Sequence, residues 1–127
     1  MELTDKFREI LSEIEAEKGP FLFAALIERD NTPGRKDLVV SAPWISNDDE
    51  FYKYLSPKLH RHLSKEDWFE YSRTEAIDPS DRFIREFTRY TGPVTKELNL
   101  LNLRIANVDM KYAHLFPTHA GNFSYAQ

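Results

Sequence analysis

Residues 18–43, KGPFLFAALIERDNTPGRKDLVVSAP, contain two apolar runs separated by a turn-forming segment. The first run, Phe21–Ile27, is apolar at every position, which is typical of a strand buried on both faces. The second run, Leu38–Ala42, is β-branched at its centre and ends at Pro43. Asp30–Gly34 contains strong turn formers. We therefore expect a long hairpin whose two strands form the middle of a sheet.

The segment before this hairpin predicts an amphipathic helix. Its apolar residues follow the i, i+3, i+4, i+7 spacing of one buried stripe: Phe7, Ile10, Leu11 and Ile14. Thr4 or Asp5 can cap its start. Gly19-Pro20 ends it, because glycine adopts the left-handed cap and proline cannot continue the helical hydrogen bonds. The acidic residues occupy the other faces, where we expect them to meet water: Glu9, Glu13, Glu15 and Glu17.

The chain after the hairpin predicts further helices and strands. A helix follows Ser46 or Asn47, with a kink or a restart at Pro57, and a short helical turn follows Ser64. The remaining elements are a strand over Tyr71–Ile77, a helix that ends at Gly92-Pro93, and strands over Leu101–Ile105 and Met110–Phe116. In the first of these last strands, Leu101, Leu103 and Ile105 alternate with polar residues and are expected to share one buried face.

This order of elements, α-β-β-α-α-β-α-β-β, predicts a single α+β domain over residues 1–118. We expect a mainly antiparallel sheet of about five strands with helices packed on it. Residues 119–127 are short and polar and predict a flexible C-terminal tail.

Composition excludes several kinds of chemistry. The chain of 127 residues has no cysteine, which removes disulfides, thiolate zinc sites, iron–sulfur clusters and cysteine nucleophiles. Its four glycines form no Gly-rich phosphate- or dinucleotide-binding motif. We therefore expect no cofactor and no metal site. A formal net charge of −4 argues against nucleic acid as the main partner.

The start of the chain, Met1–Asp5, lacks the basic residues and the apolar run of a signal peptide. The longest apolar run is the first strand of the hairpin, far short of the roughly 20 residues that span a bilayer. We expect a cytoplasmic protein that does not engage a membrane.

The histidines are candidates for chemistry. His60 and His62 lie two residues apart on a predicted helix, so their side chains point about 200° apart and chelation would require unwinding. Counting by twos along the last predicted strand places His114 with three other residues: Met110, Tyr112 and Phe116. Two interpretations of His114 stay open. It either packs among the aromatic side chains with one hydrogen-bonded nitrogen, or acts as a general base or ligand contact.

Two rows of basic residues follow helical spacing. One row is Lys58, Arg61 and Lys65, and the other is Arg82, Arg85 and Arg89, where Glu86 can pair with Arg82. Each row fits an ordinary charged helix face. If the two rows were adjacent in the fold, they would form a surface for an anionic partner.

The aromatic residues exceed what one core needs. The segments Phe51–Tyr54 and Trp68–Tyr71 carry more rings than one helix stripe and one strand face can bury. We expect some of them at the surface, where aromatic residues are enriched in protein interfaces, and this surplus suggests a homodimer or another protein partner. Trp44, just after Pro43, is either a plug of the core or a platform for a ligand.

The continuous stretch from Lys18–Phe21 through Asp37–Trp44 resembles a block found in small bacterial proteins to which no activity is assigned. The resembling residues are chiefly structural: a helix cap, a strand, a loop and a second strand. The resemblance implies a bacterial, cytosolic origin and one small α+β domain, and it implies no catalytic residue.

Two functional hypotheses follow. The first is a non-enzymatic protein-interaction or regulatory module, of the immunity or antitoxin kind, whose acidic surface masks a basic partner. The second is a small-ligand-binding domain or enzyme with a pocket between sheet and helices. In that pocket His114 and Tyr112 would be polar contacts, and Arg85 or Arg89 would receive an anionic group. The second hypothesis requires His114 and an arginine to face one pocket.

Overall fold

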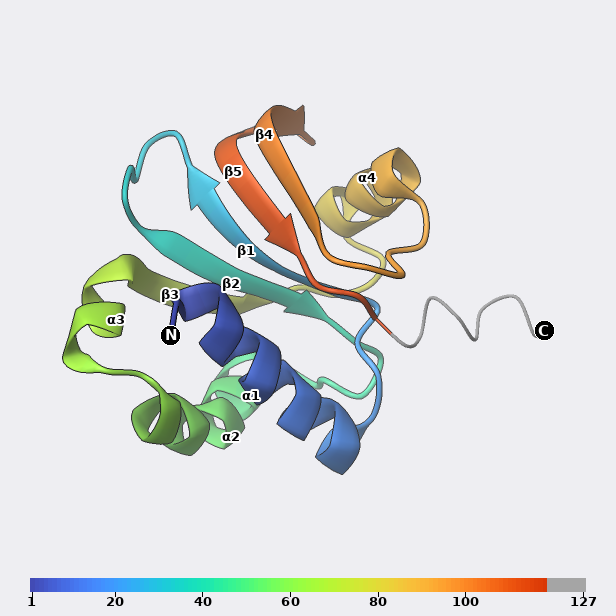
Figure 1. Cartoon of the computed structure of the whole chain (residues 1–127). Coiled ribbons are helices and arrows are strands. Elements are labelled where there is room, and N and C mark those ends of the chain that lie inside the picture. The colour runs from blue at the N-terminus through green and yellow to red at the C-terminus, as the bar shows by residue number, and fades with distance from the viewer. Residues whose placement is uncertain (119–127) are drawn as a thin grey trace.

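The computed structural model describes residues 1–118 (Figure 1). The tail predicted for residues 119–127 lies outside the described residues. The described chain forms one α+β domain, and its elements follow the predicted order. They are α1 (Leu3–Lys18), β1 (Phe23–Arg29), β2 (Lys36–Ser41), α2 (Asp48–His62), α3 (Lys65–Glu70), β3 (Tyr71–Ala76), α4 (Arg82–Thr91), β4 (Leu98–Ile105) and β5 (Val108–Leu115).

The five strands form one mixed sheet in the order β3-β2-β1-β5-β4, with β1 at its centre. β1 pairs antiparallel with both β2 and β5, and β4 pairs antiparallel with β5. β2 and β3 run parallel, because the connection through α2 and α3 returns the chain to the end of the sheet at which β2 begins. The predicted hairpin in the middle of a mainly antiparallel sheet is therefore confirmed, with one parallel pair at the β3 edge.

Helices cover both faces of the sheet (Figure 1). On one face, Phe7 of α1 and Leu55 of α2 share a buried core with Leu26 of β1. On the other face, Phe87 of α4 shares a second core with Ala25. Successive residues of a strand point to opposite faces, so β1 contributes to both cores. This is why the first apolar run of the sequence has no polar position.

The starts of α2 and α3 occur where the sequence places them, but the predicted cap of α1 at Thr4 or Asp5 is wrong. α1 begins earlier, at Leu3, because Asp5 lies inside the first turn and accepts a hydrogen bond from the backbone N–H of the cap residue Glu2 at 3.3 Å.

Asn47 caps α2 by accepting a hydrogen bond from the backbone N–H of Glu50 at 2.9 Å. Pro57 lies inside α2, which continues to its end without restarting. Ser64 and Asp67 form a reciprocal capping box at the start of α3.

Strand β5 contains an irregularity that changes which residues share a face. Its register against β1 shifts between Tyr112 and Met110. The shift places Met110 in the core under α4, whereas His114 pairs with Leu26 and faces α1. The prediction that Met110 and His114 share one face is therefore wrong, because counting by twos fails across a bulge.

The alternation predicted for β4 is also interrupted. Asn102 has a positive φ of 54°, a conformation that breaks the regular pleat. Leu103 and Ile105 pack into the core under α4, but Leu101 is 66% exposed. The expectation that Leu101 shares their buried face is wrong for this physical reason.

Candidate functional site

The residues that the sequence proposes for a ligand pocket lie on opposite faces of the sheet. His114 and Tyr112 lie on β5 and face the layer of α1, since His114 pairs with Leu26. Arg85 and Arg89 are exposed on α4, which covers the other face. The structure therefore brings His114 and Tyr112 together and brings neither arginine to them.

His114 is 6% exposed and has both ring nitrogens engaged. Its Nε2 lies 2.6 Å from Oε1 of Glu97, and its Nδ1 lies 2.5 Å from Oδ1 of Asn99. The hydroxyl of Tyr112 donates to the same Asn99 oxygen at 2.9 Å. Of the two interpretations of His114, this geometry favours the packed, hydrogen-bonded histidine, with two bonded nitrogens in place of one. Neither nitrogen is open to a substrate proton.

Glu97 joins the cluster of His114, Asn99 and Tyr112 to α1. The Nε and Nη2 atoms of Arg8 donate to the two oxygens of Glu97 at 2.5 and 2.8 Å. The hydrogen bonds from Arg8 and then from His114 outweigh the partial burial of Glu97 and lower its pKa to about 2. The hydrogen bonds to Glu97 and Asp5 raise the pKa of Arg8. The cluster is thus an ion-pair network that ties α1 to β5.

Trp44 fills the junction between α1 and β1. Its Nε1 donates to the carbonyl of Pro20 at 3.0 Å. Its ring packs against Phe21 and Phe51, with centroids 5.3 and 6.0 Å away. A Cβ at Gly19 would lie 3.5 Å from the ring, and the φ of +121° at Gly19 also favours glycine. These contacts favour the plug over the ligand platform.

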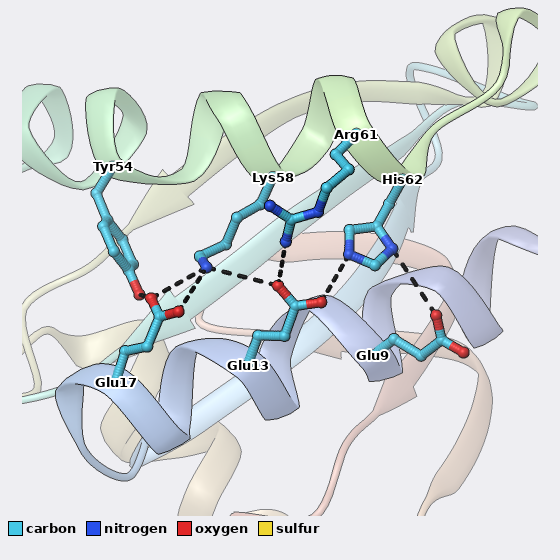
Figure 2. Close-up of polar contacts among 7 residues, drawn as sticks. All are labelled: Glu9, Glu13, Glu17, Tyr54, Lys58, Arg61 and His62. Carbon is cyan, nitrogen blue, oxygen red and sulfur yellow. Dashed lines mark hydrogen bonds and ion pairs between the residues drawn. The ribbon is translucent and has the colours of Figure 1, made fainter.

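An ion-pair seam joins α1 to α2 (Figure 2). It consists of Glu9, Glu13 and Glu17 of α1 with Tyr54, Lys58, Arg61 and His62 of α2. The nitrogen of Lys58 lies 3.0 Å from Oε1 of Glu17 and 3.5 Å from Oε1 of Glu13. Arg61 pairs with the same Glu13 oxygen, and His62 Nε2 lies 2.7 Å from its other oxygen.

The seam changes how two charge patterns of the sequence are interpreted: the acidic face of α1 and the basic row on α2. Partial burial raises the pKa of Glu13, but the hydrogen bond from His62 and the nearby positive charges hold it below its ordinary value. The hydroxyl of Tyr54 and the ammonium of Lys58 lower the pKa of Glu17. Glu13 and Glu17, predicted to face water, are instead paired with Lys58 and Arg61 of α2. These two carboxylates are therefore not free to bind a basic partner.

The two basic rows lie on opposite faces of the sheet, because α2 packs on one face and α4 on the other. Arg82 pairs with Glu86 as predicted, while Arg85 and Arg89 are exposed. The rows therefore do not combine into one basic surface.

A groove of about 640 Å³ lies between the first turns of α2 and the edge strand β3; we call it the α2–β3 groove. It brings together the two ring-rich segments of the sequence. Tyr52 is 41% exposed on its α2 side, Trp68 of α3 is half-buried, and Tyr71 is buried at the start of β3. The rings of Trp68 and Tyr71 meet edge to face, with centroids 5.7 Å apart.

Charged side chains of both signs line the same groove: Arg35, Asp48, Asp49, Lys53 and Arg73. Two of them hold the ends of β3. Arg35 donates to the carbonyl of Tyr71 at 2.9 Å, and Asp48 accepts a hydrogen bond from the N–H of Ala76 at 2.6 Å. The groove therefore has a fixed wall.

The outer edge of β3 also offers backbone groups to the groove. The N–H of Ile77 donates to the carbonyl of Val40 in β2, whereas the N–H of Ala76 points the other way, to Asp48. Alternate residues of a strand direct their backbone groups to the same side. The N–H and the carbonyl of Thr74 therefore point away from β2, and Thr74 lines the groove.

Other types of site have little support in residues 1–118. In this part of the chain, no group of three or more His, Asp or Glu side chains is placed to hold a metal ion. No helix in these residues is both long and apolar enough to cross a bilayer. An apolar cavity of about 230 Å³ lies between the sheet and the end of α4, lined among others by Phe23, Thr88, Val94 and Leu115. The four polar residues proposed for a pocket do not line it.

Comparisons with models of protein families, with curated proteins and with solved structures find no match for this chain. The candidate site therefore rests on geometry. Sequence reasoning placed Tyr52 and Trp68 among the surplus rings but missed Thr74, and it missed Glu97 and Asn99 as the partners of His114. A single polar residue in a strand pattern does not by itself show what it contacts; only the register of the β4–β5 hairpin could have placed Asn99 opposite His114.

Proposed function

We propose that this protein is a regulatory protein-interaction module in which an extended segment of a partner protein lies in the α2–β3 groove. One observation carries the proposal. The exposed ring of Tyr52 and the half-buried ring of Trp68 converge beside an edge strand whose Thr74 backbone groups point outward. Aromatic side chains supply contact area at a low entropic cost, and an edge strand adds main-chain hydrogen bonds.

The groove also indicates what the partner segment contains. An apolar or aromatic side chain fits against Tyr52 and Trp68, and the mixed charges of Arg35 and Asp49 favour flanking charges of both signs. An immunity- or antitoxin-like role remains part of the proposal, with the α2–β3 groove as its binding surface. The groove replaces the acidic face of α1 in this role, because the ion-pair seam engages carboxylates of that face. A bacterial, cytoplasmic setting, implied by the resembling block, belongs to the same proposal.

A small-ligand-binding domain or enzyme is the competing proposal. The apolar cavity beside α4 supports it. The polar residues named for the pocket do not, because they lie on two faces of the sheet. A thermal-shift screen against small metabolites tests it. A ligand whose stabilisation disappears in Val94→Trp, which fills the cavity, would favour this proposal over the groove.

The interaction proposal is tested by comparing Tyr52→Ala with Tyr90→Ala. Both tyrosines are exposed on helices, but Tyr90 lies on α4 and outside the groove. Partners are captured from a lysate of the source cell with each purified variant, and the captured protein is then titrated in purified form. We expect Tyr52→Ala to weaken binding by about tenfold or more, as a central aromatic anchor does. Tyr90→Ala should bind like the unsubstituted chain.

Circular dichroism and the midpoint of thermal unfolding establish that both variants are folded. Equal binding by the two variants would place the partner elsewhere and overturn the assignment of the groove. Failure of the unsubstituted chain to retain any protein would overturn the interaction module itself.

A further inference from the structure

The two edges of the sheet differ (Figure 1). The edge at β3 is interrupted, since its register against β2 shifts beside Asp37 and Asp48 occupies the N–H of Ala76. Charged Arg73 and Glu75 also lie on it. Such features limit the part of β3 that can pair with another strand to a short stretch around Thr74, and they disfavour pairing along the whole edge. The edge at β4, by contrast, pairs only with β5 among the described strands.

The backbone of β5 indicates which groups of β4 are free. The N–H of Phe116 donates to the carbonyl of Ala24 in β1 at 2.9 Å. Alternate residues of an antiparallel strand bond to opposite neighbours, so Leu115 and Ala113 bond to β4. Their register partners are Leu98 and Leu100.

It follows that Asn99 and Leu101, the residues between and beyond these partners, direct their N–H and carbonyl groups to the open edge. The same two residues are exposed. The side chain of Asn99 is held by Tyr112 and His114, which fixes the edge strand at this point.

The side chains of this edge lack the usual protection against pairing. Leu98–Leu101, the part of β4 before the break in the pleat at Asn102, contains no charged residue and no proline. Leu101 is 66% exposed on the α1 side of the sheet. An uncharged edge strand with an exposed leucine is a template for another strand.

We propose that β4 pairs antiparallel with β4 of a second copy of this chain, with the two-fold axis at Leu100. In this register Asn99 lies opposite Leu101 of the partner subunit, and Leu101 lies opposite Asn99 of the partner subunit. Each of these two pairs exchanges two backbone hydrogen bonds, because both residues direct their backbone groups outward. The result is one continuous sheet across two subunits.

The register is consistent with the faces of the sheet. Opposite residues of an antiparallel pair share a face, and Asn99 and Leu101 lie on the same face, since their register partners are His114 and Tyr112. A second copy is the occupant that fits this edge, because a two-fold axis at Leu100 places the uncharged residues around it against the same uncharged residues, with no like charges to repel. The exposed leucines of the two subunits lie diagonally across the pair and cover each other.

This dimer is independent of the α2–β3 groove, so Tyr52→Ala should leave it intact. The test is the molar mass across the micromolar range, by sedimentation equilibrium, of Leu101→Lys and Phe69→Lys. Phe69 is 67% exposed on α3 and is a matched control for the exposure of Leu101. We expect the unsubstituted chain and Phe69→Lys to form dimers and Leu101→Lys to raise the dissociation constant about tenfold or more, because two like charges then meet at the strand pair.

The register is tested by a cysteine, which is unique in this chain because the sequence has none. Leu100→Cys should form a disulfide-linked dimer on mild oxidation, because its two copies face each other at the axis in a pair without backbone hydrogen bonds. Phe69→Cys should remain unlinked. A monomer at all concentrations, including one whose β4 edge pairs with a different protein, would overturn the proposal. So would a dimer that Leu101→Lys leaves unchanged.

Discussion

The ammonium nitrogen of Lys58 lies 3.0 Å from a carboxylate oxygen of Glu17, across the contact between α1 and α2 (Figure 2). Lys58 is only 7% exposed, so its hydrocarbon stem packs between the helices while its charge meets two carboxylates. A lysine is rarely buried unless it is paired. The pair therefore fixes how the first helix lies against the second.

Replacing this lysine should destabilise the fold. Lys58→Ala is expected to lower the free energy of unfolding by about 1–3 kcal/mol, because it removes charged hydrogen bonds and buried stem contacts. Lys53→Ala, at an exposed lysine of the same helix, should change it by less than about 0.5 kcal/mol. Urea unfolding followed by circular dichroism measures both. Equal effects of the two substitutions would contradict the role of the seam.

Glu97 should contribute stability that disappears in acid. Its pKa is lowered in the folded protein to about 2 from an ordinary value of 4.5, so the folded state favours the ionised form. The contribution is fully present above pH 4.5 and is lost as the pH falls from 4.5 towards 2. Urea midpoints of Glu97→Gln should therefore fall less steeply over this range than those of the unsubstituted chain. If Glu97→Gln and the unsubstituted chain gave parallel pH profiles, the assignment would be refuted. Glu66→Gln, at an exposed glutamate of α3, is the control.

Removing an unbonded hydroxyl should stabilise the protein. Ser41 is fully buried, and its Oγ has no hydrogen-bond partner among residues 1–118. Ser41→Ala is expected to raise the free energy of unfolding by about 1 kcal/mol, because a buried polar group without a partner carries its desolvation cost. Ser64→Ala should act in the opposite direction by about 1 kcal/mol, because that hydroxyl caps α3. Thermal unfolding of both variants decides; destabilisation by Ser41→Ala would disprove the prediction.

The β4–β5 turn offers a second stabilising change. Ala106 has a φ of 50°, a conformation that costs a residue with a Cβ about 1–2 kcal/mol. Ala106→Gly removes this strain, and the added freedom of the unfolded chain cancels about 0.4–1 kcal/mol. We expect a net gain of about 0.5–1 kcal/mol by urea unfolding. Ala16→Gly on the exposed side of α1 should instead lose about 1 kcal/mol, and the same sign for both would contradict this account.

Much of the fold could be predicted from local patterns. The apolar stripe of α1 and the unbroken apolar run of β1 each report burial directly, because helix and strand periods differ. The sheet order could not be predicted in the same way. The insertion of β5 between β1 and β4 is a long-range pairing, and it places His114 on the face opposite Arg85. No spacing along the chain reports that separation.

The candidate site was visible in part. The ring surplus around Tyr52 and Trp68 predicts an exposed aromatic surface, and both segments meet at the α2–β3 groove. The partner of His114 could have been found from the hairpin, because a turn at Ala106-Asn107 brings Asn99 opposite His114. The ion-pair seam required knowing that α1 and α2 pack together, since each charge pattern alone fits a solvated face.

The central place of β1 in the sheet has a consequence for synthesis on the ribosome. Its backbone groups at Ala24 and Leu26 are directed to β5, which is made last among the described strands. A nascent chain that ends before Val108 holds the most apolar strand of the domain with one side unpaired. Protection of the growing chain from self-association thus depends on how quickly its final strand reaches the gap between β1 and β4.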